Sequence, residues 1–328
     1  MNNETRKTTI DWQFWISIPI LIILPFFTPY HAVATNILII GLFATGFNIL
    51  LGYTGQLSFG HASFYGLGAY GTGLLIVKLN APLWAAMAGG VLAASLGAWI
   101  IGYLALRRSD VYFSLLTLAF SQILYFLAFQ FRSVTGGDDG LRGIPVFKPF
   151  GIDLGQALNM YYFAFAFFIA MTYLARVLLR SPLGKAMRAV KENEDRAIAC
   201  GFNTQGVKLL SFIISGVYGG VAGALFTIHT RHVATDLLYW TMNGEVIFVS
   251  IVGGVGTFFG PIVGSAAFLL IHDYLQILFT RWELIVGMIL IFFILFFKQG
   301  IVGAIENWVA SNREKKAARA GRGQGGGS

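Results

Sequence analysis

The chain has 328 residues, of which 56% are hydrophobic and only 12% are charged, and its formal net charge at pH 7 is +8. This composition is too apolar for a water-soluble globular domain and indicates an integral membrane protein. The positive excess forms no basic patch interleaved with aromatic residues, so we expect no nucleic-acid partner. Cys200 is the only cysteine, which excludes an intrachain disulfide bond and a cysteine-based metal cluster.

Predicted membrane segments begin close to the N-terminus. Residues 12–77 contain no Asp, Glu, Lys or Arg, which is enough apolar sequence for about three crossings at roughly 20 residues each. Hydropathy and helix-breaking residues predict an all-α fold, a polytopic transmembrane helix bundle with about 10 membrane segments, some of them broken or re-entrant. The predicted segments are 13–29, 33–51, 59–77, 82–106, 111–131, 158–179, 207–228, 244–257, 260–279 and 283–300. The first lacks an A-x-A cleavage site, so we expect it to be a retained helix.

The grouping of basic residues predicts the orientation of these segments. Basic clusters lie at 6–7, 180–208 and 313–322, and the positive-inside rule places all three in the cytoplasm. The expected regions are a cytoplasmic N-terminus 1–12, a transmembrane domain 13–305 with an extracytoplasmic loop 132–157 and a cytoplasmic loop 180–206, and a cytoplasmic basic tail 306–328. The tail closes on Gly-Gly-Gly-Ser, which is typical of an added linker and is given no function.

Two stretches at predicted membrane depth, 52–61 and 253–261, combine glycines with polar residues or proline. Irregular backbone persists inside a membrane only where it is buried in protein or lines a cavity. Interrupted segments in transporters mark the translocation path, so both stretches are path candidates; the alternative is that their glycines only allow close helix packing. We favour packing for isolated glycines elsewhere, namely Gly66, Gly68, Gly71, Gly73, Gly216, Gly219, Gly220 and Gly223.

The polar candidates for the translocation path have alternatives of their own. Glu245 lies in or at the rim of segment 244–257, where a carboxylate is costly and therefore functional by default. It can instead cap a helix that starts at Asn243. His61 either lines the path or is hydrogen-bonded between helices, and we favour the second role. The complete set of path candidates is Gln56, Ser58, His61, Glu245, Gly253 and Gly254.

The basic loop 180–206 has a helical pattern. From Leu183 to Ala199, apolar residues fall near helical spacing with charged residues between them, and Gly201 is available as a stop. This predicts a short amphipathic helix pair that docks into a groove of a soluble partner. The alternative is a helix lying in the lipid interface, but Glu192, Glu194 and Asp195 weaken it because an anionic leaflet repels them.

Residues 181–203, which begin Ser-Pro-Leu-Gly-Lys-Ala-Met-Arg, resemble the coupling loop of the LivM-type permeases of branched-chain amino-acid ABC importers. Similar patterns occur in 47–62, in 135–141 and in Glu245 placed eight residues before Gly253. The resemblance implies a permease subunit in the bacterial inner (plasma) membrane that forms half of the path for branched-chain or related amino acids. Its implied partners are a LivH-type second permease, two ATP-binding cassette ATPase subunits, a periplasmic solute-binding protein and the lipid bilayer.

The resemblance also implies roles for residues in the two loops. The implied ATPase-coupling residues are Gly184, Arg188, Glu192, Asp195, Ala197 and Gly201. Four residues of the loop 132–157, namely Thr135, Asp138, Asp139 and Arg142, are candidates for contacting the binding protein, with a solvated turn as the alternative.

We expect no enzyme chemistry and no cofactor in this chain. It has no G-x-x-x-x-G-K-[ST] phosphate loop, so ATP and Mg are expected on the partner subunits. The histidines lie without carboxylate or cysteine partners in the sequence, which argues against a metal site. The alternative function is a stand-alone secondary transporter or channel for a small polar solute. It needs ion-coupling carboxylates of its own within the membrane, for which Glu245 alone is weak support.

Overall fold

The computed structural model describes residues 18–28, 30–107, 110–279, 281, 284–289, 291 and 300–304. Within these residues the regular secondary structure is helical, apart from one isolated β-bridge between Leu141 and Val233. The expectation of an all-α fold is therefore confirmed for the described part of the chain. The predicted regions 1–12 and 306–328 and most of the segment 283–300 lie outside it.

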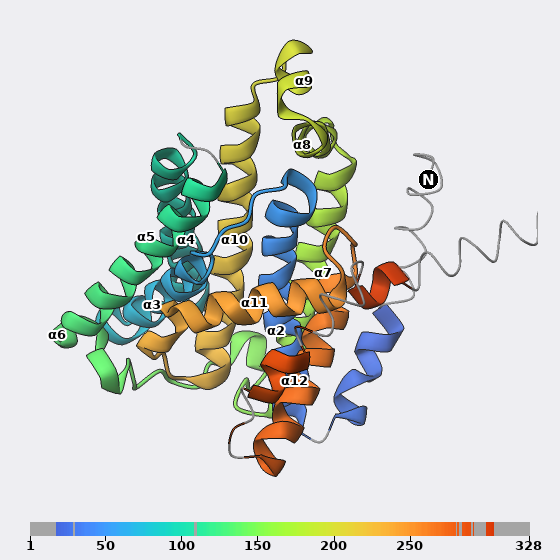
Figure 1. Ribbon diagram of the computed structural model, residues 1–328. Helices are drawn as coiled ribbons and strands as arrows, with labels where there is room; N and C mark the ends of the chain where they lie inside the picture. Colours follow the sequence, from blue (N-terminus) through green and yellow to red (C-terminus); the bar gives the residue numbers. More distant parts are fainter. Residues whose placement is uncertain are drawn as a thin grey trace, which may run out of the picture.

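Helices follow one another along the chain, and most of the longer ones are apolar (Figure 1). They are α2 (His31–Asn48), α3 (Ala62–Leu79), α4 (Leu83–Ala105), α5 (Asp110–Gln130), α6 (Arg132–Thr135), α7 (Ala157–Arg180), α8 (Pro182–Glu192), α9 (Glu194–Ala199), α10 (Thr204–Thr230), α11 (Trp240–Gly253) and α12 (Gly260–Leu278), with a π-helix η1 (Ile49–Thr54) and 3-10 turns η2 (Gly137–Asp139), η3 (Pro149–Gly151) and η4 (Thr235–Leu238). The described part of the first predicted segment contains the helix Ile18–Phe27.

Five of the described helices are long and apolar enough to cross a membrane: His31–Thr54, Leu83–Ala105, Val111–Gln130, Ala157–Arg180 and Thr204–Thr230. Each coincides with a segment predicted from hydropathy, because an uninterrupted apolar run of this length fixes a helix locally. α11 has 14 residues. At 1.5 Å per residue it spans about 21 Å, short of the roughly 30 Å hydrocarbon core of a bilayer.

α10 lies at the centre of the bundle and packs against α2, α3 and α4 (Figure 1). Glycines bring α3 and α10 into backbone contact: a Cβ at Gly68 would lie 2.4 Å from the Gly220 carbonyl oxygen, and one at Gly223 would lie 2.0 Å from the Tyr65 carbonyl oxygen. An added Cβ would fall within 3.0 Å of a neighbouring atom at each of the eight isolated glycines predicted to serve packing. Close packing is confirmed for them, as is typical of small residues between membrane helices.

The two loops with candidate functions lie at opposite ends of the helices. α8 and α9 follow the end of α7 and precede the start of α10, at the top of Figure 1. The segment 131–156 precedes α7, and Leu141 within it pairs with Val233, just beyond the end of α10. This segment therefore lies at the other end of α7 and α10 from the helix pair.

Candidate translocation and coupling site

The first predicted interruption, 52–61, is present in the structure. α2 passes into the π-helix η1, which ends at Thr54 and is capped by Gly55, a residue with a left-handed φ of 83°. Residues 55–61 are not helical, and α3 begins at Ala62. A π-helical turn widens the backbone and occurs frequently at functional sites.

Side chains from distant helices satisfy the backbone of this interruption. Ser114 on α5 donates to the Leu57 carbonyl at 2.6 Å, and the Phe59 N–H donates to Thr117 Oγ1 at 3.2 Å. The Ala62 N–H, which opens α3, donates to Asn243 Oδ1 on α11 at 2.7 Å. These bonds replace the ones that the broken helix lacks, which irregular backbone in a membrane requires.

The second predicted interruption, 253–261, is also present, since α11 ends at Gly253 and α12 begins at Gly260. Asn48 joins it to the first: its Nδ2 donates to the Thr257 carbonyl at 2.7 Å, and its Oδ1 accepts from the Gly256 N–H at 2.8 Å. The backbones touch here, because a Cβ at Gly52 would lie 2.7 Å from the Gly256 nitrogen. The two interruptions therefore form one continuous region.

His61 is fully buried within this region. Its ring stacks on Phe43 with centroids 5.2 Å apart, and Phe47 and Phe64 approach it edge-on. Nε2 lies 3.1 Å from Ser215 Oγ. This environment supports the second of the two roles considered for His61, a hydrogen-bonded contact between helices.

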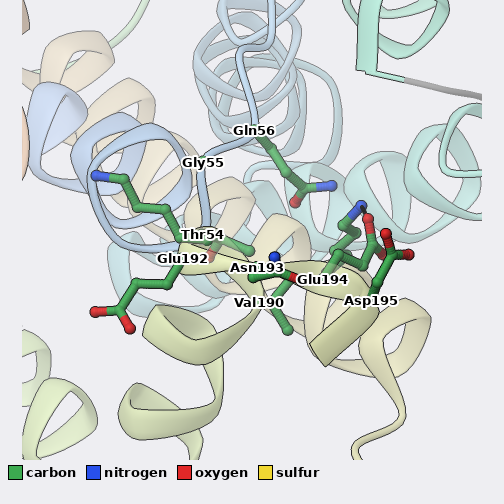
Figure 2. A pocket seen from close by; sticks show the side chains of 10 residues that line it. Thr54, Gly55, Gln56, Val190, Glu192, Asn193, Glu194 and Asp195 are labelled. Carbon is green, nitrogen blue, oxygen red and sulfur yellow. Dashed lines mark hydrogen bonds and ion pairs between the residues drawn. The ribbon is translucent and has the colours of Figure 1, made fainter. Parts of the chain in front are cut away.

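Gln56 and Ser58 differ in their surroundings. Ser58 is fully buried, and its Oγ accepts from the Gly60 N–H at 3.3 Å. Gln56 lines a polar cavity of about 300 Å³ together with residues of α8 and α9, among them Glu192 and Asp195. Figure 2 shows Gln56 extending from the chain beyond Gly55 toward the side on which Asp195 lies. A path candidate and two coupling candidates thus share one cavity.

Glu245 lies in the second turn of α11, and its side chain is partly exposed. The alternative that it caps a helix starting at Asn243 is wrong, because α11 begins at Trp240 and has no acid in its first turn. Among the described residues, no hydrogen bond or ion pair joins Glu245 to Gln56 or His61.

Gly253 and Gly254 form the turn that ends α11. A Cβ at Gly253 would lie 1.9 Å from the Gly260 carbonyl oxygen, so only glycine lets the two helices meet there. Gly254 adopts a φ of 117°, in the region that favours glycine. Both residues act through their backbone.

The predicted helix pair is present as α8 and α9. Ser181 Oγ accepts from the Gly184 N–H at 3.4 Å to cap α8, and Asn193 Oδ1 accepts from the Arg196 N–H at 2.8 Å to cap α9. Gly201, at a φ of 84°, ends α9 as expected. The Phe202 N–H donates back to the Ala197 carbonyl at 3.0 Å, which is the backbone bond of a Schellman motif.

The implied coupling residues divide between an inner and an outer face of this pair. Gly184 and Ala197 are buried, and a Cβ at Gly184 would lie 2.6 Å from main-chain oxygens of α7. Arg188 donates to the Leu179 carbonyl and places its guanidinium 5.9 Å from the Tyr53 ring centroid on η1. Three coupling candidates are exposed, namely Glu192, Asp195 and Gly201.

The candidates for binding-protein contact lie at the opposite end of the molecule. Thr135 is half-buried and donates to the Phe131 carbonyl at 2.9 Å. Asp138, Asp139 and Arg142 are exposed. This segment is exposed and is held by the hydrogen bond of Thr135, which is compatible with both alternatives, a solvated turn and a docking surface.

Three residues that organise the region were not among the sequence candidates: Asn48, Lys191 and Asn243. Lys191 Nζ donates to the Gly52 carbonyl at 2.6 Å. The sequence could have identified the two asparagines, because an amide inside an apolar segment usually forms a hydrogen bond to another helix. It could not have identified Lys191, since a lysine in a basic loop is indistinguishable from a charge that only sets orientation.

Long apolar helices with two adjoining interruptions define a multi-pass membrane protein of the transporter type. The sequence model described as "Branched-chain amino acid transport system / permease component" matches residues 30–295, so the chain belongs to this family of permeases. Membership favours the importer-subunit function over a stand-alone secondary transporter or channel.

Named relatives agree with the family. The chain is 24% identical over 293 residues to the high-affinity branched-chain amino acid transport system permease protein LivM of Escherichia coli K12, covering 82% of this chain and 69% of that protein. It is 25% identical over 240 residues to LivH of Salmonella typhimurium, covering 68% and 77%. The L-arabinose ABC transporter permease AraH of Azospirillum brasilense is 25% identical over 197 residues, covering 58% and 56%. No solved structure matches the chain.

Proposed function

We propose that this chain is the permease subunit of an ATP-driven importer and forms half of the translocation path for branched-chain or related amino acids. One observation carries the proposal beyond family membership: the α8–α9 pair is bonded to the interrupted helix, through Arg188 beside Tyr53 and Lys191 at the Gly52 carbonyl. Energy transfer from a soluble ATPase to the path requires that the helices on which the ATPase docks contact the interrupted helix.

The proposed assembly follows from the two ends of the molecule. Two ATPase subunits, which hold ATP and Mg, dock on the outer face of the helix pair, where Glu192, Asp195 and the apolar Ile198 are exposed. A LivH-type permease supplies the other half of the path. A periplasmic binding protein meets the segment that carries Asp138 and Arg142. In this arrangement both chain ends face the cytoplasm of a bacterium, and about ten segments enter the inner membrane.

The path itself is assigned to the interruptions and to Glu245. Interrupted helices in transporters lie at the solute site, and Gly253 and Gly254 shape the second interruption through their main chain. Gln56 lies where the path meets the cavity under α8. ATP binding moves a gate only through contacts that differ between its two states, and the contacts proposed to differ are those that the ATPase subunits make with the outer face of α8 and α9. Ser58 and His61 are buried parts of the same region, and His61 is assigned a packing role.

The test is ATP-dependent uptake of labelled leucine into proteoliposomes that contain the chain with its co-purified partners. Unlabelled isoleucine, valine and arabinose serve as competitors for the solute class. Ile198 is 55% exposed on α9, so Ile198→Asp should lose the ATPase subunits and the uptake. Val146→Asp, a matched change 39% exposed in the segment at the other end, should keep the ATPase subunits. Retention of ATPase subunits and uptake by Ile198→Asp would contradict the proposed docking.

A further inference from the structure

Lys191 lies at the junction of α8 and the interrupted helix. Near the end of a helix the last carbonyls lack helical partners, and Gly52 lies two residues before the end of η1. The Lys191 ammonium donates to the Gly52 carbonyl at 2.6 Å, where a cation also interacts favourably with the helix terminus. A Cβ at Gly55 would lie 3.2 Å from the Lys191 Cγ, so the lysine stem runs along the same turn.

Arg188 strengthens this junction from the same face of α8, because residues three apart on a helix are neighbours. Its guanidinium lies near the Tyr53 ring and also donates to the Leu179 carbonyl at the end of α7. Through these two side chains, α8 contacts two successive residues of η1, Gly52 and Tyr53. The buried Met187 and Val190 bind the rest of the helix to the bundle.

From Gly52 the contact continues into the second interruption. Gly52 packs directly on the Gly256 backbone, and Asn48 bonds both the Gly256 N–H and the Thr257 carbonyl. The Asn48 amide uses a donor and an acceptor in a buried setting, so it fixes the position of both partners. Contacts therefore run without a gap from Lys191 to Gly52, from Gly52 to Asn48, and from Asn48 to the backbone of residues 256–257.

We propose that Lys191 and Asn48 are positioning residues that make α8 and both interruptions move as one body during transport. The inference rests on the proposed function, since it names the physical link between the ATPase-docking helices and the path. A shift of α8 acts on Gly52 through Lys191, and Asn48 passes the displacement to the turn between α11 and α12. Neither residue has to touch the solute.

The first test compares uptake with solute-stimulated ATP hydrolysis in the assembled complex. Lys191→Met should lower the number of solutes transported per ATP hydrolysed about tenfold, a typical size for coupling between sites. Lys191→Arg, which keeps a charged donor, should restore the ratio to within about twofold of wild type. Lys78→Met is the control, because Lys78 also donates to a main-chain carbonyl, that of Ser133 at 3.2 Å, but at the other end of the helices from α8. A wild-type ratio in Lys191→Met would overturn the inference.

The second test needs no change at Lys191 and decides the matter if that variant fails to assemble. In the Cys200→Ser complex, spin labels are placed in pairs at exposed Lys185, Val255 and Trp99 on α8, the second interruption and α4. A non-hydrolysable ATP analogue should change the distances from Trp99 to both other labels and leave the Lys185–Val255 distance unchanged. A comparable change in the Lys185–Val255 distance, or no change at all, would overturn the proposal.

These outcomes separate the inference from the proposed function. Failure of the wild-type complex to take up any tested solute with ATP would reject the proposed function itself. ATP-dependent uptake by the wild type together with an unchanged ratio in Lys191→Met would reject the link alone.

Discussion

At the residue scale, buried polar side chains hold the interrupted region together. Ser215 donates its hydroxyl hydrogen to the Gly46 carbonyl at 2.6 Å, so the His61 Nε2–H must be the donor in the 3.1 Å contact with Ser215 Oγ. This assigns the neutral tautomer with the proton on Nε2. Nδ1 is then an acceptor with no partner among the described residues. His61 is thus held by ring contacts on several sides and by one hydrogen bond to α10.

The packing role of His61 gives a direct prediction. His61→Phe keeps the ring among Phe43, Phe47 and Phe64 and should leave uptake within about twofold of wild type. His61→Ala leaves a cavity and should reduce stability by about 3–5 kcal/mol, as for other buried rings. Uptake and thermal unfolding in detergent are measured for both. A His61→Phe protein that unfolds like wild type but transports nothing would indicate that His61 lines the translocation path.

Asn243 gives a second prediction at this scale. Asn243→Leu has a similar shape but leaves the buried Ala62 N–H without its 2.7 Å acceptor, a loss of about 1–3 kcal/mol. Hydrogen exchange at the start of α3 should become faster. Gln130→Leu, the same kind of change at an exposed site on α5, should stay within about 0.5 kcal/mol of wild type. Equal effects of the two changes would mean that Asn243 does not cap α3.

At the scale of whole elements, the structure separates what local sequence determines from what it does not. The helix pair α8–α9 was predictable, because the helical spacing of its apolar residues, its capping residues and the terminating Gly201 all lie within one short stretch of sequence. The bond from Asn48 to Thr257 was not, since it joins residues 209 positions apart. The path and coupling candidates were predicted as separate groups, yet Gln56 and Asp195 share one cavity. Predicting that requires the packing of α8 on η1, which hydropathy does not encode.

The contact between α3 and α10 yields an element-scale prediction. A Cβ at Gly223 would meet the Tyr65 carbonyl at 2.0 Å and the Ala69 nitrogen at 2.8 Å. Both are main-chain atoms, so the helices must separate, and Gly223→Ala should cost about 1–3 kcal/mol. Gly244→Ala is the matched control, because no atom lies within 4 Å of its added Cβ. It should be neutral or stabilising by up to about 1 kcal/mol, since alanine favours helix. The order of the two unfolding temperatures checks the argument.

At the scale of the whole molecule, the two loops lie at opposite ends of α7 and α10, which is the arrangement that the proposed partners on both membrane faces require. Five described helices are long and apolar enough to cross between them. By the positive-inside rule, the basic residues near α8 and α9 predict that this end faces the cytoplasm. The exposed Asp138 and Arg142 then face the other side.

The single cysteine makes this orientation measurable without altering the chain. Cys200 is exposed beside the end of α9, so a membrane-impermeant maleimide should label it in inside-out vesicles and not in intact spheroplasts. Asp138→Cys in a Cys200→Ser background should show the reverse pattern. Because the ATPase subunits are proposed to cover α9, adding them should slow the labelling of Cys200 and leave that of Asp138→Cys unchanged. Labelling of Cys200 in intact spheroplasts would show that α8 and α9 face outward, and it would contradict the docking of the ATPases on them.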